Sequence, residues 1–486
     1  MIILARKNSF SFKKNIFQIP IIVIVCALIA ITSGCASTNE GTFGGSLGSS
    51  TYSGDIDPSA SQDTTISVVE SKLSSCQQSI TLANGQIAKY SCVSVMFGTN
   101  RATSNNSKLF YGKSPIKFNQ PLKYGEVVVS IPDNHQPGSA ISGAEGPVDG
   151  KNIRAREKFF TIWDGKDGIT ELTENEFAKV SKHKLKSVPD SKRRTFVFIH
   201  GYNVSFEGAA YRTAQLKADL EINAPAYFFS WPSNSNTQQY ISDQDDVDLS
   251  VERLVEFLET VKKSVGEDVE LNLIAHSLGN RLLGKALDQI KNKSAVSNQM
   301  FDLGIFASAD LDENLFRKWI GGENINGSGQ ALIKRAVLYV TDDDKALWVS
   351  RLLRRVKCSD MDEKFRVGLV TKKSCAGSRY VTTMSPPFYT VDLSFIPNEK
   401  RIDIFENNHA KYVDSPRTIC HVKRLIWGSQ SVADDDAEYL KVKTQGNKKY
   451  WIMDNEVPLS WERDCNIKLN QVTPEFVMNF AHIPRR

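Results

Sequence analysis

Short apolar runs alternate with amphipathic stretches along the chain from Thr195 onward. The runs are nearly continuous and rich in Val, Ile, Leu and Phe, which is typical of strands in a parallel sheet covered on both faces. They predict strands at residues 195–199, 226–231, 269–275, 303–307, 336–340 and 389–394. The stretches between them predict helices at 207–222 and 247–265, after Ser277, and from Ser415-Pro416 onward. This alternation indicates an α/β fold with a doubly wound, mostly parallel sheet.

The segments on either side of this pattern are predicted to be extensions of it. Residues 66–190 contain extended candidates at 126–131 and 158–162, which we expect to be leading antiparallel strands with insertions. Residues 428–486 show no periodicity that assigns an element, so they form a C-terminal extension of open role. The main α/β domain is therefore predicted at residues 66–427, with 66–190 as its N-terminal part.

The start of the chain has the layout of an export signal. Basic residues precede an apolar run at 16–31, which is short for a membrane span. The run ends in Ile31-Thr32-Ser33-Gly34-Cys35, which resembles a bacterial lipoprotein cleavage site, with Thr32 where an aliphatic residue is usual. We predict a signal peptide at 1–34, a lipid on Cys35, and a place in the cell envelope, at the outer membrane because Ala36 follows. A retained N-terminal anchor and ordinary cleavage are the alternatives.

Residues 35–65 are predicted to be a flexible tether. They are dominated by Gly, Ser and Thr and contain few apolar residues, so they cannot build a core of their own. The tether would separate the folded domain from the membrane that holds the lipid.

The charge balance gives no indication of a nucleic-acid partner. The chain has 60 Lys and Arg against 55 Asp and Glu, and four of the basic residues precede residue 35. Removing those four leaves 56 basic against 55 acidic residues, which excludes the basic excess expected of a nucleic-acid-binding protein. The oligomeric state is left open.

Six cysteines remain after Cys26, in the signal, and Cys35 are set aside. An even number suits an oxidising compartment, and none of the six forms a CxxC pair, so we predict neither a zinc site nor a cofactor. We expect neighbours in sequence to pair, with six buried thiols as the alternative: Cys76 with Cys92, Cys358 with Cys375 and Cys420 with Cys465.

The strongest chemical motif is Ala275-His276-Ser277-Leu278-Gly279 between a predicted strand and a predicted helix. Small residues two before and two after the Ser allow a strained turn that exposes its hydroxyl, as in the nucleophile elbow of α/β-hydrolases. Ala275 replaces the usual first Gly. The motif predicts that Ser277 is a catalytic nucleophile.

Acyl transfer to Ser277 requires donors for the developing oxyanion. The turn His200-Gly201-Tyr202-Asn203 directly follows the first strong strand. We assign the two donors to the backbone amides of Tyr202 and Leu278, and we expect the His200 side chain to shape its own turn.

The base and the acid are chosen by their order after the nucleophile, because this fold carries Ser, acid and His in that sequence. His409 is left as the base when the other six His residues are set aside. His135 and His183 precede the Ser, His200 and His276 belong to the two turns described above, His421 lies in a predicted helix and His482 lies near the end of the chain. Three carboxylates follow the strand that ends at Val340, and we favour Asp344 over its neighbours. The alternatives are Asp342, Asp343 and, after the preceding strand, Asp310.

Several motifs together resemble one bacterial family. They are His200-Gly201-Tyr202-Asn203, Ser230-Trp231-Pro232-Ser233, Tyr240 with Asp243, Ala275 to Arg281, and Asp344-Lys345-Ala346-Leu347, with Thr99-Asn100-Arg101 and Tyr124-Gly125 upstream. This set is similar to the α/β-hydrolases catalogued as domain of unknown function 900, over about residues 92–427. The resemblance implies the α/β-hydrolase fold and the triad Ser277, Asp344 and His409, but no substrate.

The sequence therefore predicts a serine hydrolase that acts on a small-molecule or lipid ester, held at the membrane by its N-terminal lipid. The competing hypothesis is a lipoprotein of the same fold whose triad is idle and which serves as a binding or structural module of the envelope.

Overall fold

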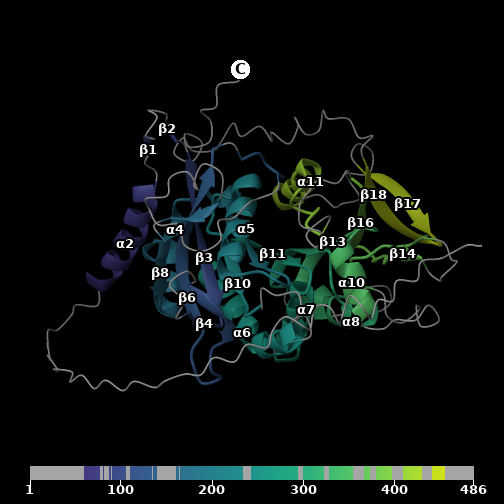
Figure 1. Cartoon of the computed structure of the whole chain (residues 1–486), viewed down its shortest axis with the longest axis horizontal. Helices are drawn as coiled ribbons and strands as arrows, with labels where there is room; N and C mark the ends of the chain where they lie inside the picture. Colours follow the sequence, from purple (N-terminus) through teal and green to yellow (C-terminus); the bar gives the residue numbers. More distant parts are fainter. Residues whose placement is uncertain are drawn as a thin grey trace, which may run out of the picture. The chain divides into compact units, whose positions relative to one another are not determined.

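Eight parallel strands form the centre of the sheet in this computed structural model (Figure 1). The structure describes residues 60–76, 80–81, 87–88, 90–104, 110–133, 135–139, 160–163, 165–233, 242–293, 299–321, 328–353, 366–372, 379–396, 409–428 and 440–454. The twelve-stranded sheet has the order β17-β18-β16-β13-β12-β11-β9-β10-β3-β6-β7, and β8 also pairs with β6. The parallel strands are β3 (Tyr90–Thr99), β9 (Arg194–Ile199), β10 (Tyr227–Ser230), β11 (Glu270–His276), β12 (Phe301–Ala307), β13 (Ile333–Val340), β16 (Phe388–Phe395) and β18 (Lys448–Asp454).

Antiparallel strands close both ends of this sheet. β6 (Lys123–Pro132), β7 (Thr161–Ile162) and β8 (Ile169–Leu172) continue it beyond β3, and β17 (Lys441–Gln445) continues it beyond β18. Among the described residues, three small two-stranded sheets lie outside it: β1 (Ile80–Thr81) with β2 (Ile87–Ala88), β4 (Arg101–Thr103) with β5 (Tyr111–Pro115), and β14 (Thr371–Lys372) with β15 (Arg379–Tyr380). Each strand predicted from the apolar pattern between 195 and 394 is present within three residues of its predicted bounds.

The order of the strands reverses at β9. The chain passes from β9 to β10 on one side and then to β11 on the other side of β9. In doubly wound sheets such a reversal opens a crevice outside the carboxyl ends of the strands, where ligands bind. The carboxyl ends of β9 and β11 therefore mark the edge where a site is expected, and we call it the carboxyl edge of the sheet.

Helices cover the sheet between successive strands. They are α2 (Ala60–Cys76), α4 (Glu174–Lys186), α5 (Phe206–Asp219), α6 (Ser242–Val265), α7 (Gly279–Lys293), α8 (Glu313–Trp319), α9 (Ser328–Leu332), α10 (Lys345–Leu353) and α11 (Pro416–Trp427), with short 3-10 turns at Gly165–Gly168 and Asp190–Lys192. The connection β9–α5–β10 runs one way along the sheet, and the connection β10–α6–β11 runs back the other way, past β9. Because such connections are right-handed, α5 and α6 lie on opposite faces. Accordingly α6 packs against α4 and α7, whereas α5 lies with α11, whose Trp427 indole donates to the carbonyl of Leu220 at 2.8 Å.

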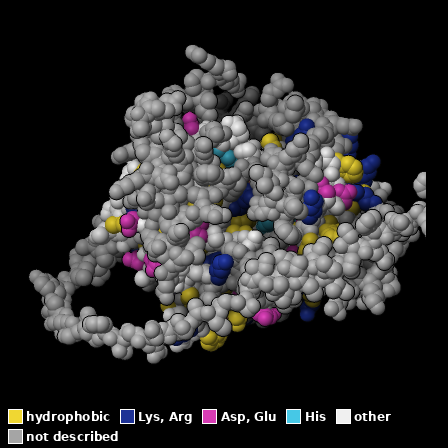
Figure 2. Space-filling view, viewed as in Figure 1, with side chains coloured by type: hydrophobic (Ala, Val, Ile, Leu, Met, Phe, Trp, Pro, Cys, Tyr) yellow, Lys and Arg dark blue, Asp and Glu magenta, His cyan; other side chains and the backbone are white. Residues whose placement is uncertain are grey.

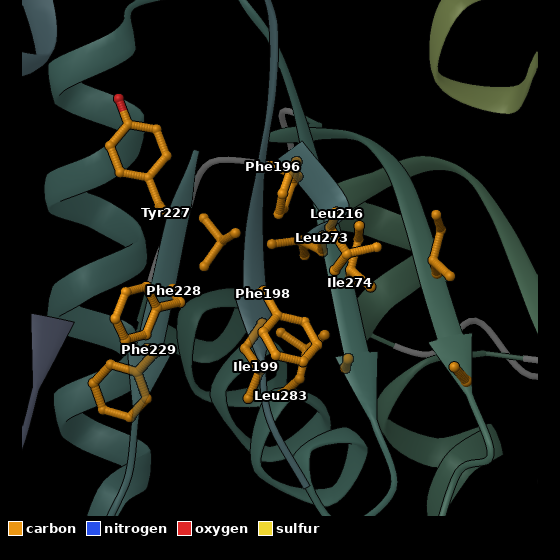
Figure 3. Close-up of a cluster of buried hydrophobic side chains, with 14 of the residues drawn as sticks. Phe196, Phe198, Ile199, Leu216, Tyr227, Phe228, Phe229, Leu273, Ile274 and Leu283 are labelled. Atoms are coloured by element: carbon orange, nitrogen blue, oxygen red, sulfur yellow. The ribbon is translucent and has the colours of Figure 1, made fainter. Parts of the chain in front are cut away.

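The core lies on both faces of β9, β10 and β11 (Figure 3). Phe196 and Phe198 of β9, Phe228 of β10 and Leu273 of β11 are all at most 2 % exposed. Because successive residues of a strand point to opposite faces, a fully apolar strand requires cover on both sides. This is why the apolar pattern predicted the central strands well.

The N-terminal boundary differs from the prediction. Helix α2 begins at Ala60, so residues 60–65, which were assigned to the tether, are helical. The helix is held by packing rather than by a broad apolar face: Val69 is buried, and the Thr65 hydroxyl donates to Glu176 of α4 at 3.2 Å. The predicted signal peptide, Cys35 and the tether up to residue 59 lie outside the described residues.

The disulfide between Cys76 and Cys92 is confirmed, with 6.0 Å between the Cα atoms, and it joins the end of α2 to β3. Cys420 is also disulfide-bonded. Its predicted partner Cys465, and the predicted pair Cys358 and Cys375, lie outside the described residues.

The C-terminal extension takes part in the main sheet. β18 pairs with β16 in parallel and β17 folds back on β18, so the sheet does not end at residue 427. Trp451 packs edge-on against Tyr389 of β16, with ring centroids 5.3 Å apart. The tight turn at Gly446, which has a φ of 65°, connects the two strands. Within the described part of the chain no helix combines the length and the apolar character that crossing a bilayer requires.

Acid should destabilise the fold through His421. Burial lowers the pKa of His421 to about 3, and the Tyr339 hydroxyl lies 2.6 Å from its Nδ1. Because the folded pKa lies below the unfolded value of 6.5, the unfolded chain binds the extra proton between these values, and stability falls as the pH drops through this window. This one group should contribute about 1.4 kcal/mol per pH unit to the free energy of unfolding.

Urea titrations at several pH values give the slope of the free energy of unfolding against pH. His421→Gln should reduce this slope, whereas Tyr339→Phe should keep it. An unchanged slope in His421→Gln would contradict this account.

Gly279 should tolerate no side chain although it lies in a helix. A Cβ at this position would lie 2.4 Å from the carbonyl oxygen of His200 and 2.7 Å from that of Ile199. Gly279→Ala should therefore lower the free energy of unfolding by about 1–3 kcal/mol, although alanine favours helices. Gly284→Ala in the same helix meets only the Trp319 side chain and Ile320, no closer than 3.2 Å, and is the matched control. Equal stability of the two variants in denaturant titrations would show that the close approach is unimportant.

Candidate active site

Ser277 occupies a sharp turn between β11 and α7. Its φ is 53°, a left-handed conformation that side chains other than glycine rarely adopt. The amide of Ser277 donates to Ala307 at 3.0 Å, and its carbonyl accepts from the Asp310 amide at 3.2 Å and the Asn280 side chain at 3.0 Å. Several bonds thus hold one strained residue, which is the arrangement predicted for a nucleophile elbow.

The turn after β9 lies directly against this Ser. A Cβ on Gly201 would fall 2.6 Å from the Cβ of Ser277, so only glycine permits the approach. Tyr202 follows Gly201 and Leu278 follows Ser277, so the two predicted donor amides each lie one residue beyond this contact. Asn203 has a φ of 58°, and its amide donates to the Ser233 hydroxyl at 2.8 Å, which fixes the far end of the turn.

His200 supports the turn. Its Nδ1 lies 2.8 Å from the Gly201 carbonyl, its ring stacks on Trp231 with centroids 5.2 Å apart, and the Trp231 indole donates to the His200 carbonyl at 2.8 Å. Burial, with nearby Arg101, lowers the pKa of His200 to about 3, so the ring is neutral. These contacts fit the predicted shaping role.

Arg101 is a part of the site that sequence reasoning did not assign. Its side chain is buried and donates to the Ser230 hydroxyl at 2.8 Å and to the Val204 carbonyl at 2.7 Å. It also donates to the carbonyls of Gly112 and Ser233 at 3.2 and 3.4 Å. The guanidinium therefore connects the segments after β9 and β10. In the sequence, Arg101 appeared only as part of the Thr99-Asn100-Arg101 motif of the family resemblance, which gave it no structural role.

His409 and Asp344 are in contact. The Nδ1 of His409 lies 2.7 Å from Oδ2 of Asp344, whose side chain is fully buried. The other carboxylate oxygen accepts from the Leu347 amide at 2.9 Å, at the start of α10. A carboxylate on Nδ1 fixes the tautomer that leaves Nε2 as the proton acceptor, as general-base catalysis requires.

The other candidate acids have different partners. Asp342 pairs with Arg379 at 2.5 Å, and Asp343 pairs with Lys411 at 2.8 Å. Asp310 accepts from the Ser350 hydroxyl at 2.7 Å and lies 3.3 Å from Nε of Arg366. Of the four carboxylates weighed from sequence, Asp344 is thus the one that the structure brings to His409.

The main chain of His409 is tied to the elbow. Its carbonyl accepts from Nε2 of His276 at 2.9 Å and from the Ser308 hydroxyl at 2.9 Å. Burial, and then the neighbouring His409, lower the pKa of His276 well below 6.5, so this ring is neutral and donates through Nε2. His276 precedes Ser277, so the residue beside the predicted nucleophile holds the segment that carries the predicted base. The sequence did not indicate this role for His276.

Lys411 adds a second bridge between the same segments. It lies two residues after His409, and its ammonium bonds Asp343, the neighbour of Asp344. The loop with the imidazole is thereby fixed to the turn with the carboxylate at two points. In the described segments no group of three His, Cys, Asp or Glu is placed to hold a metal ion.

The similarity of this chain to individual relatives and to solved structures is low. Over 160 residues the chain is 26 % identical to the uncharacterized protein alr1448 of Nostoc sp., which covers 28 % of this chain and 40 % of that protein. The match thus spans well under two thirds of that relative. Two structures of phospholipase PlaB from Legionella pneumophila, one in complex with thio-NAD, are 13 % identical with TM-scores of 0.25 and 0.24. They cover 54 % of this chain and 67 % and 69 % of theirs.

A family model matches residues 174–423, about half of the chain, and this span includes Tyr202, Ser277, Leu278, Asp344 and His409. The strand order, the turn at Ser277 and this match agree on one architecture. The chain belongs to the α/β-hydrolases of unknown function described as domain of unknown function 900.

Proposed function

We propose that this chain is a serine hydrolase that cleaves an ester or a related acyl bond with Ser277, His409 and Asp344. The observation that carries the proposal is the bond of 2.7 Å between the side chains of His409 and Asp344. The backbone carbonyl of His409 also accepts a bond from His276, the residue before Ser277. A His–Asp pair with a fully buried carboxylate, on a segment bonded to the residue before a strained Ser, is costly to maintain for structure alone. We therefore assign the pair to proton transfer at that Ser.

The proposed reaction has two halves. Nε2 of His409 takes the proton of the Ser277 hydroxyl as its oxygen attacks the acyl carbon. The imidazolium then gives that proton to the leaving alcohol, and an acyl-enzyme remains. Water, deprotonated by the same imidazole, then attacks the acyl carbon of the acyl-enzyme. As the bond to Ser277 breaks, the imidazolium returns the proton to the Ser277 oxygen and the acid is released. Asp344 stabilises the imidazolium throughout and does not itself become protonated.

The amides of Tyr202 and Leu278 are the proposed donors to the oxyanion. The close approach of Gly201 to Ser277 supports this assignment, because Tyr202 and Leu278 are the residues that directly follow these two. A donor of this kind is typically worth about 2.7–4 kcal/mol of transition-state stabilisation. Because the bonds of Asn203 and Arg101 fix the turn beforehand, little reorganisation is needed during the reaction.

Removing the nucleophile should abolish hydrolysis. Ser277→Ala should lower kcat on a short-chain chromogenic ester by roughly 10⁴- to 10⁶-fold, because the attacking oxygen is lost. Ser350→Ala, which removes another buried hydroxyl near this edge, should stay within about tenfold of the wild type. Retention of wild-type turnover by Ser277→Ala would refute the assignment.

The choice of acid can be tested with isosteric amides. Asp344→Asn should lower kcat by about 10⁴-fold, because the amide favours the wrong tautomer of His409. Asp342→Asn, which loses only the pair with Arg379, should change kcat by less than about tenfold. Steady-state kinetics of the two variants, with circular dichroism to check folding, decides the point: a larger loss in Asp342→Asn would show that the acid is misassigned.

A further inference from the structure

In the described part of the chain, four large hydrophobic side chains are exposed at the carboxyl edge of the sheet. One of them, Phe395 at the end of β16, lies against the Arg379 guanidinium, and the other three are more exposed. Phe118 is 87 % exposed, Leu249 is 63 % and Trp348 is 56 %. Isolated exposed hydrophobic residues are common on soluble proteins, but several on the one edge that carries a candidate site indicate a contact surface. We call these three residues the apolar rim.

The topology places all three on the edge that carries Ser277. Phe118 lies in the turn before β6, whose first residue pairs with Thr99 at the end of β3. Leu249 lies in the N-terminal part of α6, the helix that follows β10, and Trp348 lies on α10, four residues after Asp344. Hydrophobic side chains are visible at the lower margin of the face in Figure 2, around the position of α6 in Figure 1.

The turn that carries Phe118 is held rigidly. The Gln120 amide donates to the Lys117 carbonyl at 2.9 Å, and the Lys117 amide donates to the Gln120 side chain at 3.1 Å. Arg253 of α6 donates to the carbonyls of Phe118 and Gln120, both at 2.7 Å. Leu249 lies one helical turn before Arg253, on the same side of α6. The bonds from Arg253 therefore hold the Phe118 turn close to Leu249. A loose turn would let Phe118 fold inward, whereas this one keeps it in solvent.

The rim spans a wide part of the edge. Between β6 and β13 there are six strand spacings of about 4.8 Å, or roughly 29 Å. Exposed lysines lie near its two ends: Lys113 in β5 and Lys117 next to Phe118 at one end, and Lys345 one turn before Trp348 at the other. The middle is acidic, because Asp245 and Glu252 of α6 are exposed near Leu249, where Asp248 pairs with Lys285. Separate hydrophobic side chains with lysines at the two ends of the row suit a broad surface that is apolar inside and carries phosphate groups outside.

We propose that the carboxyl edge of the sheet docks on a phospholipid surface, with Phe118, Leu249 and Trp348 inserted among the acyl chains, and that the substrate is an ester carried by the lipid. This proposal rests on the proposed hydrolase function for its substrate, but not for the docking itself. Docking would bring lipid esters to Ser277 without complete extraction from the bilayer. The predicted lipid on Cys35 would hold the chain near such a surface but would not orient it.

Orientation can be measured on the full chain with added tryptophans. Phe118→Trp reports the rim, and Val68→Trp reports the side of the domain, because Val68 is exposed on α2 between Thr65 and Glu70, which contact α4. The probes are vesicles of phosphatidylglycerol and acyl-brominated phosphatidylcholine. Any N-terminal anchor would bring both variants to the vesicles equally.

We expect the added emission of Phe118→Trp to be quenched and that of Val68→Trp to be unaffected, each measured against the wild type. Equal quenching at both positions, or none at 118, overturns the docking proposal, as does quenching that occurs only at 68. This result does not depend on any catalytic activity.

Activity provides the second readout. Phe118→Ser with Leu249→Ser should lower hydrolysis of vesicle phospholipid by roughly tenfold or more, the cost of losing two buried side chains. Hydrolysis of a soluble short-chain ester should stay within about twofold, and Val68→Ser should change neither rate. Equal losses on both substrates would overturn the lipid assignment. If the wild type cleaves no ester at all, the proposed function fails while the quenching result still decides the docking.

Discussion

The site depends on how the His409 segment is held. Its imidazole bonds Asp344, its carbonyl accepts from His276 and Ser308, and Lys411 bonds Asp343 close by. These contacts reach the ends of β11, β12 and β13, three neighbouring strands of the parallel sheet. Parallel strands end at one edge, so a single short segment can contact all three. The sheet thereby brings side chains more than sixty residues apart in sequence to one place.

Backbone strain gathers at the same edge. Ser277 follows β11, Ser308 follows β12 and Asn203 follows β9, and all three have positive φ values of 53°, 44° and 58°. Conformations of this kind cost about 1–3 kcal/mol each and persist only where surrounding bonds fix them. Here the bonds come from the adjoining strand ends and from Ser233. The neutral rings of His200, which is buried, and His276, which is half-buried, support the turns without adding charge. The stability of the sheet thus maintains a strained edge at the candidate site.

The sequence predicted the central fold because parallel strands buried on both faces leave continuous apolar runs. It also predicted the strained turn at Ser277 and the turn at Gly201, where local steric demands select small residues. It favoured Asp344 as the acid of the triad but left Asp342 and Asp343 as alternatives, because three consecutive Asp residues are alike in sequence. They differ in the side chain that each contacts in the fold, which is Arg379, Lys411 and His409 for Asp342, Asp343 and Asp344. Arg101 and Lys411 escaped assignment because their partners are distant in sequence. The hairpin β17–β18 was missed because β17 is exposed and mostly polar, although Gly446-Asn447 is a usual turn pair.

The central claim is that Ser277 is an activated nucleophile in the folded protein. Reaction of the full chain with a fluorophosphonate, followed by mass spectrometry of tryptic peptides, tests it directly. The account predicts one adduct, on Ser277 in the peptide of residues 264–281, which is absent when the chain is unfolded before reaction. A folded protein that remains unlabelled, or one labelled on a different serine, would contradict it.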